Sequence, residues 1–221
     1  MGGTPYKADK KRIDEIEQQI GMSTAGNSIL GLKMPTDPRW ADLASVSLEE
    51  ILTDHAFCEQ KAATQCITLI QRYADREDLV NALSPIVTEE WGHFRMVWAE
   101  MKKRGFVLGK QRKDEYVNLL LANEPKNVHG EEKLLHKLMI CALIEARSCE
   151  RFRLLSENLE EEALRKFYHK FMVSEAGHYR LFIDLATQYF DAAKVRDAWQ
   201  QWLKIEEGVL QQLVPRGDRM H

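Results

Sequence analysis

Two pairs of residues with the spacing Glu-x-x-His are the features of this sequence most able to carry chemistry. Glu90 and His93 lie in E-E-W-G-H-F, and Glu175 and His178 lie in S-E-A-G-H-Y. Residues three positions apart share one face of a helix, so each pair can present a carboxylate and an imidazole to one metal ion. A single pair of this kind arises readily by chance, so the interpretation depends on what accompanies the two pairs.

A further glutamate precedes each pair at nearly the same distance. Glu59, in H-A-F-C-E-Q-K-A-A, precedes Glu90 by 31 residues, and Glu145, in C-A-L-I-E-A-R-S-C-E, precedes Glu175 by 30. In an antiparallel helix hairpin, residues equidistant from the turn lie level with each other. The two midpoints fall within R-Y-A-D-R-E-D and just after S-E-N-L, which are turn or capping signals. We therefore expect Glu59 to face Glu90 and Glu145 to face Glu175.

Two such hairpins can pair into a four-helix bundle with four carboxylates and two imidazoles at one level. This donor set suits a bridged pair of iron or manganese ions and leaves positions open for oxygen. Four buried carboxylates without cations would be very costly, so the pattern requires metal or protons. The expected ligands are Glu59, Glu90, His93, Glu145, Glu175 and His178.

Several nearby residues are weaker candidates for ligands. His55 lies one helical turn before the first glutamate and is expected outside the ligand set. Glu89 points about 100° away from its neighbour on an ideal helix, so we do not expect it to bind metal. Cys141 and Cys149 flank Glu145 by one turn on each side. They are expected to form small walls of the oxygen pocket, with a thiolate ligand as the alternative.

The elements that must position these residues are helices, because glycine and proline are sparse and the periodicity is helical. S-L-E-E, which begins at Ser47, is a predicted capping box. Gly105 is a predicted helix stop. Pro85 is expected to kink its helix or move the start. The expected main helices are Ser47–Tyr73, Glu77–Arg104, Glu131–Ser156, Glu160–Tyr189 and Ala192–Gln212, with a short helix at Asp114–Ala122 in the connection 105–130.

The composition indicates a chain of 221 residues that can bury a sizeable core, since 44% of it is hydrophobic. No apolar run approaches the roughly 20 residues of a membrane span, and the first residues lack a secretory pattern, so we expect a cytoplasmic protein. The four cysteines form no C-x-x-C pair and are expected to be free. The net charge of −3 argues against a generally basic nucleic-acid-binding surface.

The motif I-E-A-R-S-C-E-R-F, residues 144–152, resembles the bacterial tRNA 2-methylthio-N6-isopentenyladenosine hydroxylases. The resemblance extends over about residues 42–188 and includes the segments around the six expected ligands. It implies an all-α, ferritin-like four-helix bundle with a long crossover between its second and third helices and an extra C-terminal helix. The expected organisation is one domain: a lead-in over 1–40, the bundle over 47–189 and the extra helix over 192–212.

The resemblance also implies an activity: oxygen-dependent hydroxylation of the isopentenyl side chain of the modified adenosine next to the anticodon. The six ligands would then hold two iron ions, although manganese fits the same set. Oxygen and an external electron donor, a separate reductase or a ferredoxin-type protein, would complete the reaction. The partner would be the anticodon loop of tRNA, and no membrane is implied. The oligomeric state stays open.

Substrate contacts are harder to predict than ligands. An apolar pocket must receive the prenyl group, and core packing is the alternative role for each aromatic candidate. The basic stretch 102–113 is either a solvated helix end or a phosphate contact. The candidate walls are Phe57, Trp91, Phe94, Trp98 and Phe152, and the candidate phosphate contacts are Lys110, Arg112 and Lys113. Arg147 and Arg151 either pair with acids such as Glu150 or lie at the surface.

Two other functions compete with the hydroxylase. A rubrerythrin-like or ferritin-like peroxide reductase or ferroxidase would use the same bundle, but the sequence lacks the C-x-x-C pairs of a rubredoxin-like iron site. It also shows no clear cage-forming signature. A helical interaction module with surface acids is the non-enzymatic alternative. Failure to bind added iron or manganese would favour that module.

Overall fold

The protein is described by a computed structural model over residues 29–221. The first part of the expected lead-in therefore lies outside the described residues. Within the described range the chain forms seven α-helices and a 3-10 turn at Ile29–Gly31, with no strand. None of the described helices is long and apolar enough to cross a membrane.

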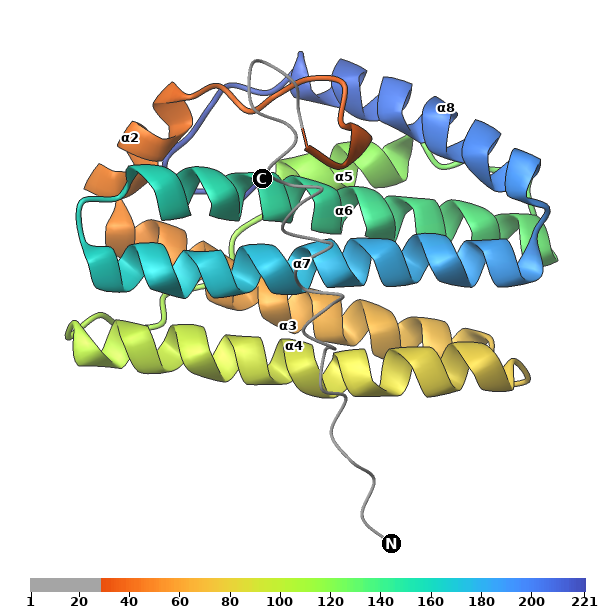
Figure 1. The fold of residues 1–221 in the computed structure, drawn as a ribbon, viewed down its shortest axis with the longest axis horizontal. Helices are drawn as coiled ribbons and strands as arrows, with labels where there is room; N and C mark the ends of the chain where they lie inside the picture. Colours follow the sequence, from red (N-terminus) through yellow and green to blue (C-terminus); the bar gives the residue numbers. More distant parts are fainter. Residues whose placement is uncertain (1–28) are drawn as a thin grey trace, which may run out of the picture.

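Four long helices form a bundle, and Figure 1 shows them running side by side along its longest axis. They are α3 (Leu48–Arg72), α4 (Glu77–Lys103), α6 (Gly130–Asn158) and α7 (Glu162–Tyr189). α3 packs against α4, and α6 against α7, as two antiparallel hairpins. The crossover from α4 to α6 contains α5 (Glu115–Ala122), and α8 (Ala192–Leu210) follows the bundle. The expected all-α bundle with a long crossover and an extra helix is confirmed.

The turns of both hairpins lie where the sequence placed them. α3 ends and α4 begins around residues 74–75, and α6 and α7 are separated by residues 159–161. α4 continues through Pro85 and starts at the expected residue. Gly105 ends α4 with a φ of +74°. Its amide donates to the Lys102 carbonyl and the Phe106 amide donates to the Met101 carbonyl, which is the Schellman arrangement of a glycine stop.

The predicted capping box at Ser47 is wrong. The Ser47 side chain caps no helix, because an unexpected helix, α2 (Arg39–Val46), ends directly before it. The Ser47 amide instead donates to the Ala44 carbonyl at the end of α2. Glu49, which lies within the same S-L-E-E motif, accepts a hydrogen bond from the amide of Val107 in the crossover at 3.3 Å.

The buried apolar residues form two clusters, and the buried acids lie where these clusters meet. On α3, Ile51, Leu52 and Ala56 belong to one cluster, whereas Cys66 and Leu69 belong to the other. The buried glutamate of α3 lies between these two groups, and α7 repeats the same order. The bundle thus has an apolar core on both sides of one polar layer.

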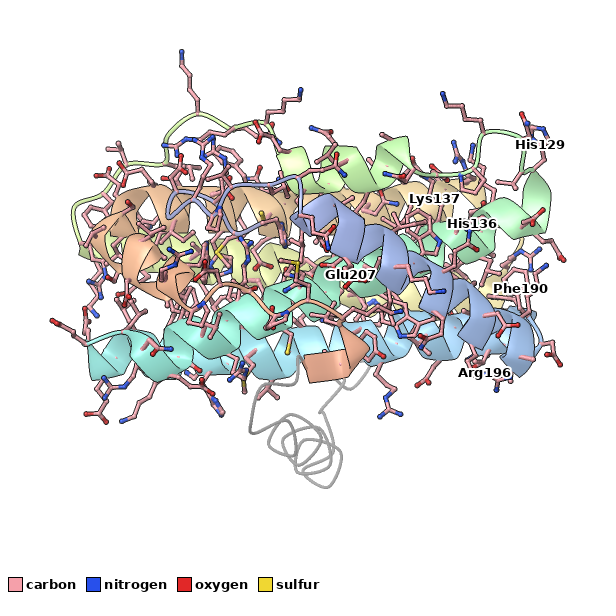
Figure 2. The ribbon with its side chains drawn as sticks, turned by 90° about the horizontal axis from the view of Figure 1, so that it is seen from above. His129, His136, Lys137, Phe190, Arg196 and Glu207 are labelled. Carbon is pink, nitrogen blue, oxygen red and sulfur yellow. The ribbon has the colours of Figure 1, made fainter. Side chains whose placement is uncertain are left out.

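α8 covers α6 on the outside of the bundle, and Figure 2 shows it running obliquely across the long helices. Trp202 of α8 is buried, and its indole Nε1 donates to Nδ1 of His136 on α6 at 3.0 Å. This bond satisfies the indole N–H of Trp202 and one ring nitrogen of His136. The helix therefore shields one face of α6 from water.

Candidate metal centre

The polar layer contains all six residues that the sequence selects as ligands. One comes from α3, two from α4, one from α6 and two from α7, and every one is buried. They are Glu59, Glu90, His93, Glu145, Glu175 and His178. The sequence intervals predict that the facing glutamates of each hairpin lie level with each other. The structure agrees, because side chains from all four helices meet at one depth of the bundle.

The six residues divide into two overlapping sets of four. Within each set, ligand atoms lie within 4.8 Å of one another, which suits a single metal ion. Glu90 and Glu175 belong to both sets. The other members are one glutamate and one histidine per set, namely Glu59 with His93 and Glu145 with His178. The two sets could hold two metal ions side by side, and Glu90 and Glu175 would be available to both ions.

Both imidazoles turn the same nitrogen toward the acids. Nδ1 of His93 lies 3.3 Å from Glu59 Oε2 and 3.3 Å from Glu90 Oε2. Nδ1 of His178 lies 2.9 Å from Glu90 Oε1 and 3.1 Å from Glu175 Oε2. Nδ1 is therefore the atom that each ring would offer to a metal, and Nε2 points away from the four glutamates of the two sets.

Glu89 faces the far side of both imidazoles. Its Oε1 lies 3.5 Å from Nε2 of His178 and 3.9 Å from Nε2 of His93, and it accepts a hydrogen bond from Ser174 Oγ at 2.6 Å. The contact with His178 lowers the pKa of Glu89 to about 2. Glu89 belongs to neither set of four, but the sequence reasoning missed its position beside both rings. The spacing of four residues between Glu89 and His93 could have indicated this position, because residues one turn apart share a helix face.

His55 supports the site from within the core. Its Nε2 lies 2.7 Å from Glu59 Oε1, and its ring packs against Phe152 and Phe171 with centroid distances of 4.7 and 4.6 Å. Burial lowers the pKa of His55 well below its ordinary value, so the ring is neutral where it meets Glu59. His55 lies outside both sets of four, where the sequence analysis expects it.

The electrostatics of the layer fit bound cations. Burial, together with repulsion among the acids, raises the pKa of Glu59 and Glu145 well above the ordinary range. Burial opposes charge on the imidazoles, but the carboxylates outweigh it and raise the pKa of His93 to about 10. The buried Oε1 of Glu90 accepts no well-aligned hydrogen bond, although Nδ1 of His178 lies 2.9 Å away. Metal ions would replace the protons and satisfy this oxygen, and the oxygen-rich donor set suits iron or manganese.

The cysteines near the site are buried thiols. Burial raises the pKa of Cys141 to about 12, and it raises the pKa of Cys66 and Cys149 as well. None of these three thiols belongs to either set of four. Cys141 and Cys66 instead line a cavity, and Cys149 donates to the carbonyl of Met172. The alternative of a thiolate ligand therefore loses support.

A cavity of about 120 Å³ adjoins the four carboxylates. Ile140, Ile144, Phe152 and Phe182 form much of its apolar lining, and all four glutamates of the site reach it. His93 and His178 do not line it, since they lie on the other side of the acids. The open side of the carboxylate layer thus faces an apolar space between α3 and α6.

The predicted substrate contacts lie in different places. Phe152 lines the cavity, whereas Phe57, Trp91, Phe94 and Trp98 do not. Trp91 is half exposed on α4 and packs on Phe94. In the loop between α4 and α5, Lys110 and Lys113 are exposed, and Arg112 pairs with Asp218 at 3.2 Å. Their contacts with substrate stay predictions.

The arginines of I-E-A-R-S-C-E-R-F are buried and structural. Arg147 donates to Glu206 of α8 at 2.9 and 2.7 Å, and it also pairs with Glu150. It reaches residues before α2 as well, with a bond of 3.0 Å to Thr36 Oγ1. Arg151 stacks over the ring of Trp40 at 4.8 Å. The motif thus joins a ligand-bearing helix to the segments that cover it.

The sequence matches the family described as tRNA-(MS[2]IO[6]A)-hydroxylase (MiaE) over residues 25–221. The chain belongs to this family. Two relatives carry the name tRNA 2-(methylsulfanyl)-N(6)-isopentenyladenosine(37) hydroxylase. The relative from Pseudomonas putida is 39% identical over 74% of this chain and 78% of its own. The relative from Salmonella typhimurium is 28% identical over 71% of this chain and 75% of its own.

A solved structure supports the fold assignment. It is named Protein 43 with aldehyde deformylating oxygenase activity from Synechococcus. It is 33% identical to this chain, has a TM-score of 0.82, and the match covers 87% of this chain and 96% of that chain. The MiaE family match extends through the segment that follows α8, which therefore belongs to the region shared with the family.

Proposed function

We propose that the protein is an oxygen-dependent hydroxylase of the isopentenyl side chain of 2-methylthio-N6-isopentenyladenosine next to the anticodon of tRNA. Two overlapping ligand sets beside an apolar cavity carry this proposal. The names of both curated relatives agree with it.

The chemistry explains why such a site is needed. Hydroxylation of a C–H bond inserts one oxygen atom of O2 and releases the other as water, which consumes two electrons and two protons. Two iron ions would supply this oxidising power, since side chains alone do not. The six ligands would hold the ions, Glu89 would orient both imidazoles, and His55 would fix Glu59. A separate reductase or ferredoxin-type protein would deliver the electrons.

The size of the cavity favours a short prenyl chain. A cavity of roughly 150 Å³ lined by apolar side chains holds one benzene molecule. An isopentenyl group has one carbon fewer than benzene, so it suits the cavity of about 120 Å³ here. A purine ring system is larger and would stay outside. Bases of the anticodon loop can turn outward without melting a duplex, so the side chain can reach such a cavity.

A tRNA substrate also implies a location and a surface. We place the reaction in the cytoplasm, where tRNA is modified and used. The exposed Lys110 and Lys113, in the loop before α5, are the proposed contacts with anticodon-loop phosphates. Arg112 is a weaker candidate because its guanidinium already pairs with Asp218.

An aldehyde-deformylating oxygenase is the second candidate, because the solved structure with that activity is 33% identical to this chain. A long alkyl chain would need more space than the cavity beside the carboxylates offers. The comparison of a prenylated base with aldehydes of different chain length therefore separates the two activities.

The test uses iron-loaded protein, oxygen, a ferredoxin-type reductant and total tRNA that carries isopentenyladenosine. Mass spectrometry of the nucleosides should find one added oxygen on the prenylated base, and this atom should carry the label when labelled O2 is supplied. Glu145→Ala should abolish the product, whereas Glu157→Ala, on an exposed part of the same helix, should not. Hydrogen peroxide or aldehyde consumption without a hydroxylated nucleoside would overturn the proposal.

A further inference from the structure

The segment after α8 returns to the bundle and closes over the metal centre. Figure 1 shows it passing from the end of α8 toward α2. Met220 is 1% exposed, and the side chain of His221 is 3% exposed. Both residues line the cavity that the four carboxylates also line, and together with Asp114 they are the part of its wall that lies outside the helices.

Several hydrogen bonds fix this segment. The Arg219 carbonyl accepts from Trp40 Nε1 at 3.2 Å and from Arg151 Nη1 at 3.4 Å. The Met220 amide donates to Asp54 Oδ2 at 2.8 Å. These partners come from α2, α6 and α3, so the segment is held by three helices at once.

His221 is held equally firmly. Its Nε2 lies 2.9 Å from Ser148 Oγ, and its ring stacks on Tyr116 at a centroid distance of 5.1 Å. Cys58, Asp114 and His221 lie close enough together to suggest a cation site. However, the ammonium of Lys61 already pairs with Asp114 at 2.8 Å, so these groups form an ion-pair network.

A close approach at Gly217 shows how tightly the segment is docked. A Cβ atom at this position would lie 2.2 Å from the backbone oxygen of Leu43 and 2.8 Å from its Cβ. No side chain fits at these distances, so only glycine lets the chain pass α2 here. Any larger residue must push the segment away from the bundle.

His221 also borders a second cavity, of about 390 Å³, on the other side of the segment. Arg39, Arg216 and Arg219 contribute to the lining of this second cavity. The segment therefore separates a small apolar space beside the acids from a larger, arginine-lined space. This division matches the parts of a prenylated nucleotide, whose small apolar chain and large polar body require different surroundings.

We propose that residues 217–221 form the specificity wall of the cavity, and that Met220 sets the length of side chain admitted to the metal centre. The inference rests on the proposed function, because it takes the prenylated base as the ligand. With Met220 in place the cavity suits a five-carbon chain. Truncation of Met220 removes the side chain beyond Cβ and should extend the cavity toward the arginine-lined space.

The test compares two nucleosides, N6-isopentenyladenosine and N6-geranyladenosine, whose prenyl chains differ in length. Calorimetry on the metal-loaded protein without oxygen measures the Kd of each, so the readout does not depend on turnover. Wild-type protein should prefer the isopentenyl nucleoside. Met220→Ala should shift the ratio of the two Kd values at least tenfold toward the geranyl nucleoside, in line with the selectivity of apolar pockets.

Two further variants keep the test decisive. Gly217→Ala displaces the segment without changing a cavity-lining residue, and it should shift the ratio in the same direction. Met101→Ala is the matched control, because Met101 is buried in the same apolar cluster but does not line the cavity. An unchanged ratio in both Met220→Ala and Gly217→Ala would overturn the inference. Failure of wild-type protein to bind either nucleoside would instead overturn the proposed function and the inference with it.

Discussion

The buried arginine of the I-E-A-R-S-C-E-R-F motif offers a sharp test of the fold. Arg147 is fully buried and pairs with Glu150 and Glu206, which are also buried. Arg147→Met leaves two carboxylates in the core without their cation. Removal of one partner from a buried ion pair costs about 3–5 kcal/mol in the free energy of unfolding. For a chain of this size each kcal/mol changes Tm by about 2–4 °C, so Tm should fall by about 6–20 °C.

The assay is thermal unfolding followed by circular dichroism at matched metal content, since bound metal stabilises the folded state. Arg153→Met is the control. Arg153 lies on the same helix, but its ion pair with Glu157 is partly exposed and is worth less than about 1 kcal/mol. Glu206→Gln in the Arg147→Met background removes one unpaired charge and should recover part of the loss. If Arg147→Met were as stable as Arg153→Met but failed to bind tRNA, the structural role would be refuted.

Four further outcomes follow from the site and the crossover loop. Glu145→Ala should remove about half of the metal, because Glu145 belongs to one set of four, whereas Glu175→Ala should remove nearly all of it; elemental analysis of metal per chain distinguishes the two. Apparent Mn²⁺ affinity should rise between about pH 6 and pH 8, because the imidazoles and acids with raised pKa values must lose protons on binding. Calorimetry in buffers of different ionisation enthalpy should detect that proton release, and its absence would contradict the assigned protonation. Glu89→Ala should weaken metal binding by about 10–100-fold in a chelator competition, and unchanged affinity would remove its orienting role. Lys110→Glu with Lys113→Glu should weaken tRNA binding and lower the salt slope by roughly 0.7 per lost contact, and an unchanged slope would place the phosphate contacts elsewhere.

The meeting of the six candidate ligands could be predicted from sequence, because residues equidistant from the turn of an antiparallel hairpin lie at the same depth of the bundle. The intervals from Glu59 to Glu90 and from Glu145 to Glu175 have their midpoints at the observed turns. Each histidine then lies on the same helix face as the glutamate three residues before it. The sharing of Glu90 and Glu175 by both sets depends on how the two hairpins pack together, which the intervals do not determine.

The aromatic walls were harder to predict for a physical reason. An apolar face on a helix indicates burial, but it does not distinguish a residue that fills the core from one that borders a cavity. Phe152 and Phe57 are both apolar residues on bundle helices, yet only Phe152 lines the cavity. The sequence analysis excluded Glu89 because neighbouring residues on an ideal helix point in different directions. The glutamate side chain is nevertheless long enough to approach both imidazoles.

Short and irregular segments gave the weakest sequence signals. α2 has eight residues, too few for a clear periodic pattern, and its hydrogen-bonded end removes the capping role predicted for Ser47. The segment after α8 has no periodicity, and its position depends on contacts with distant residues such as Trp40 and Asp54. Gly217 is its strongest local signal, but a glycine alone does not reveal which backbone it approaches.

The position of the metal ions tests the central claim most directly. Crystals of iron-loaded protein measured at the iron absorption edge should show two anomalous peaks in the layer between α3, α4, α6 and α7. The carboxylates of Glu90 and Glu175 should lie within bonding distance of both peaks, with His93 beside one and His178 beside the other. A single peak, or peaks at Cys58, Asp114 and His221 with none in this layer, would contradict the two-metal centre.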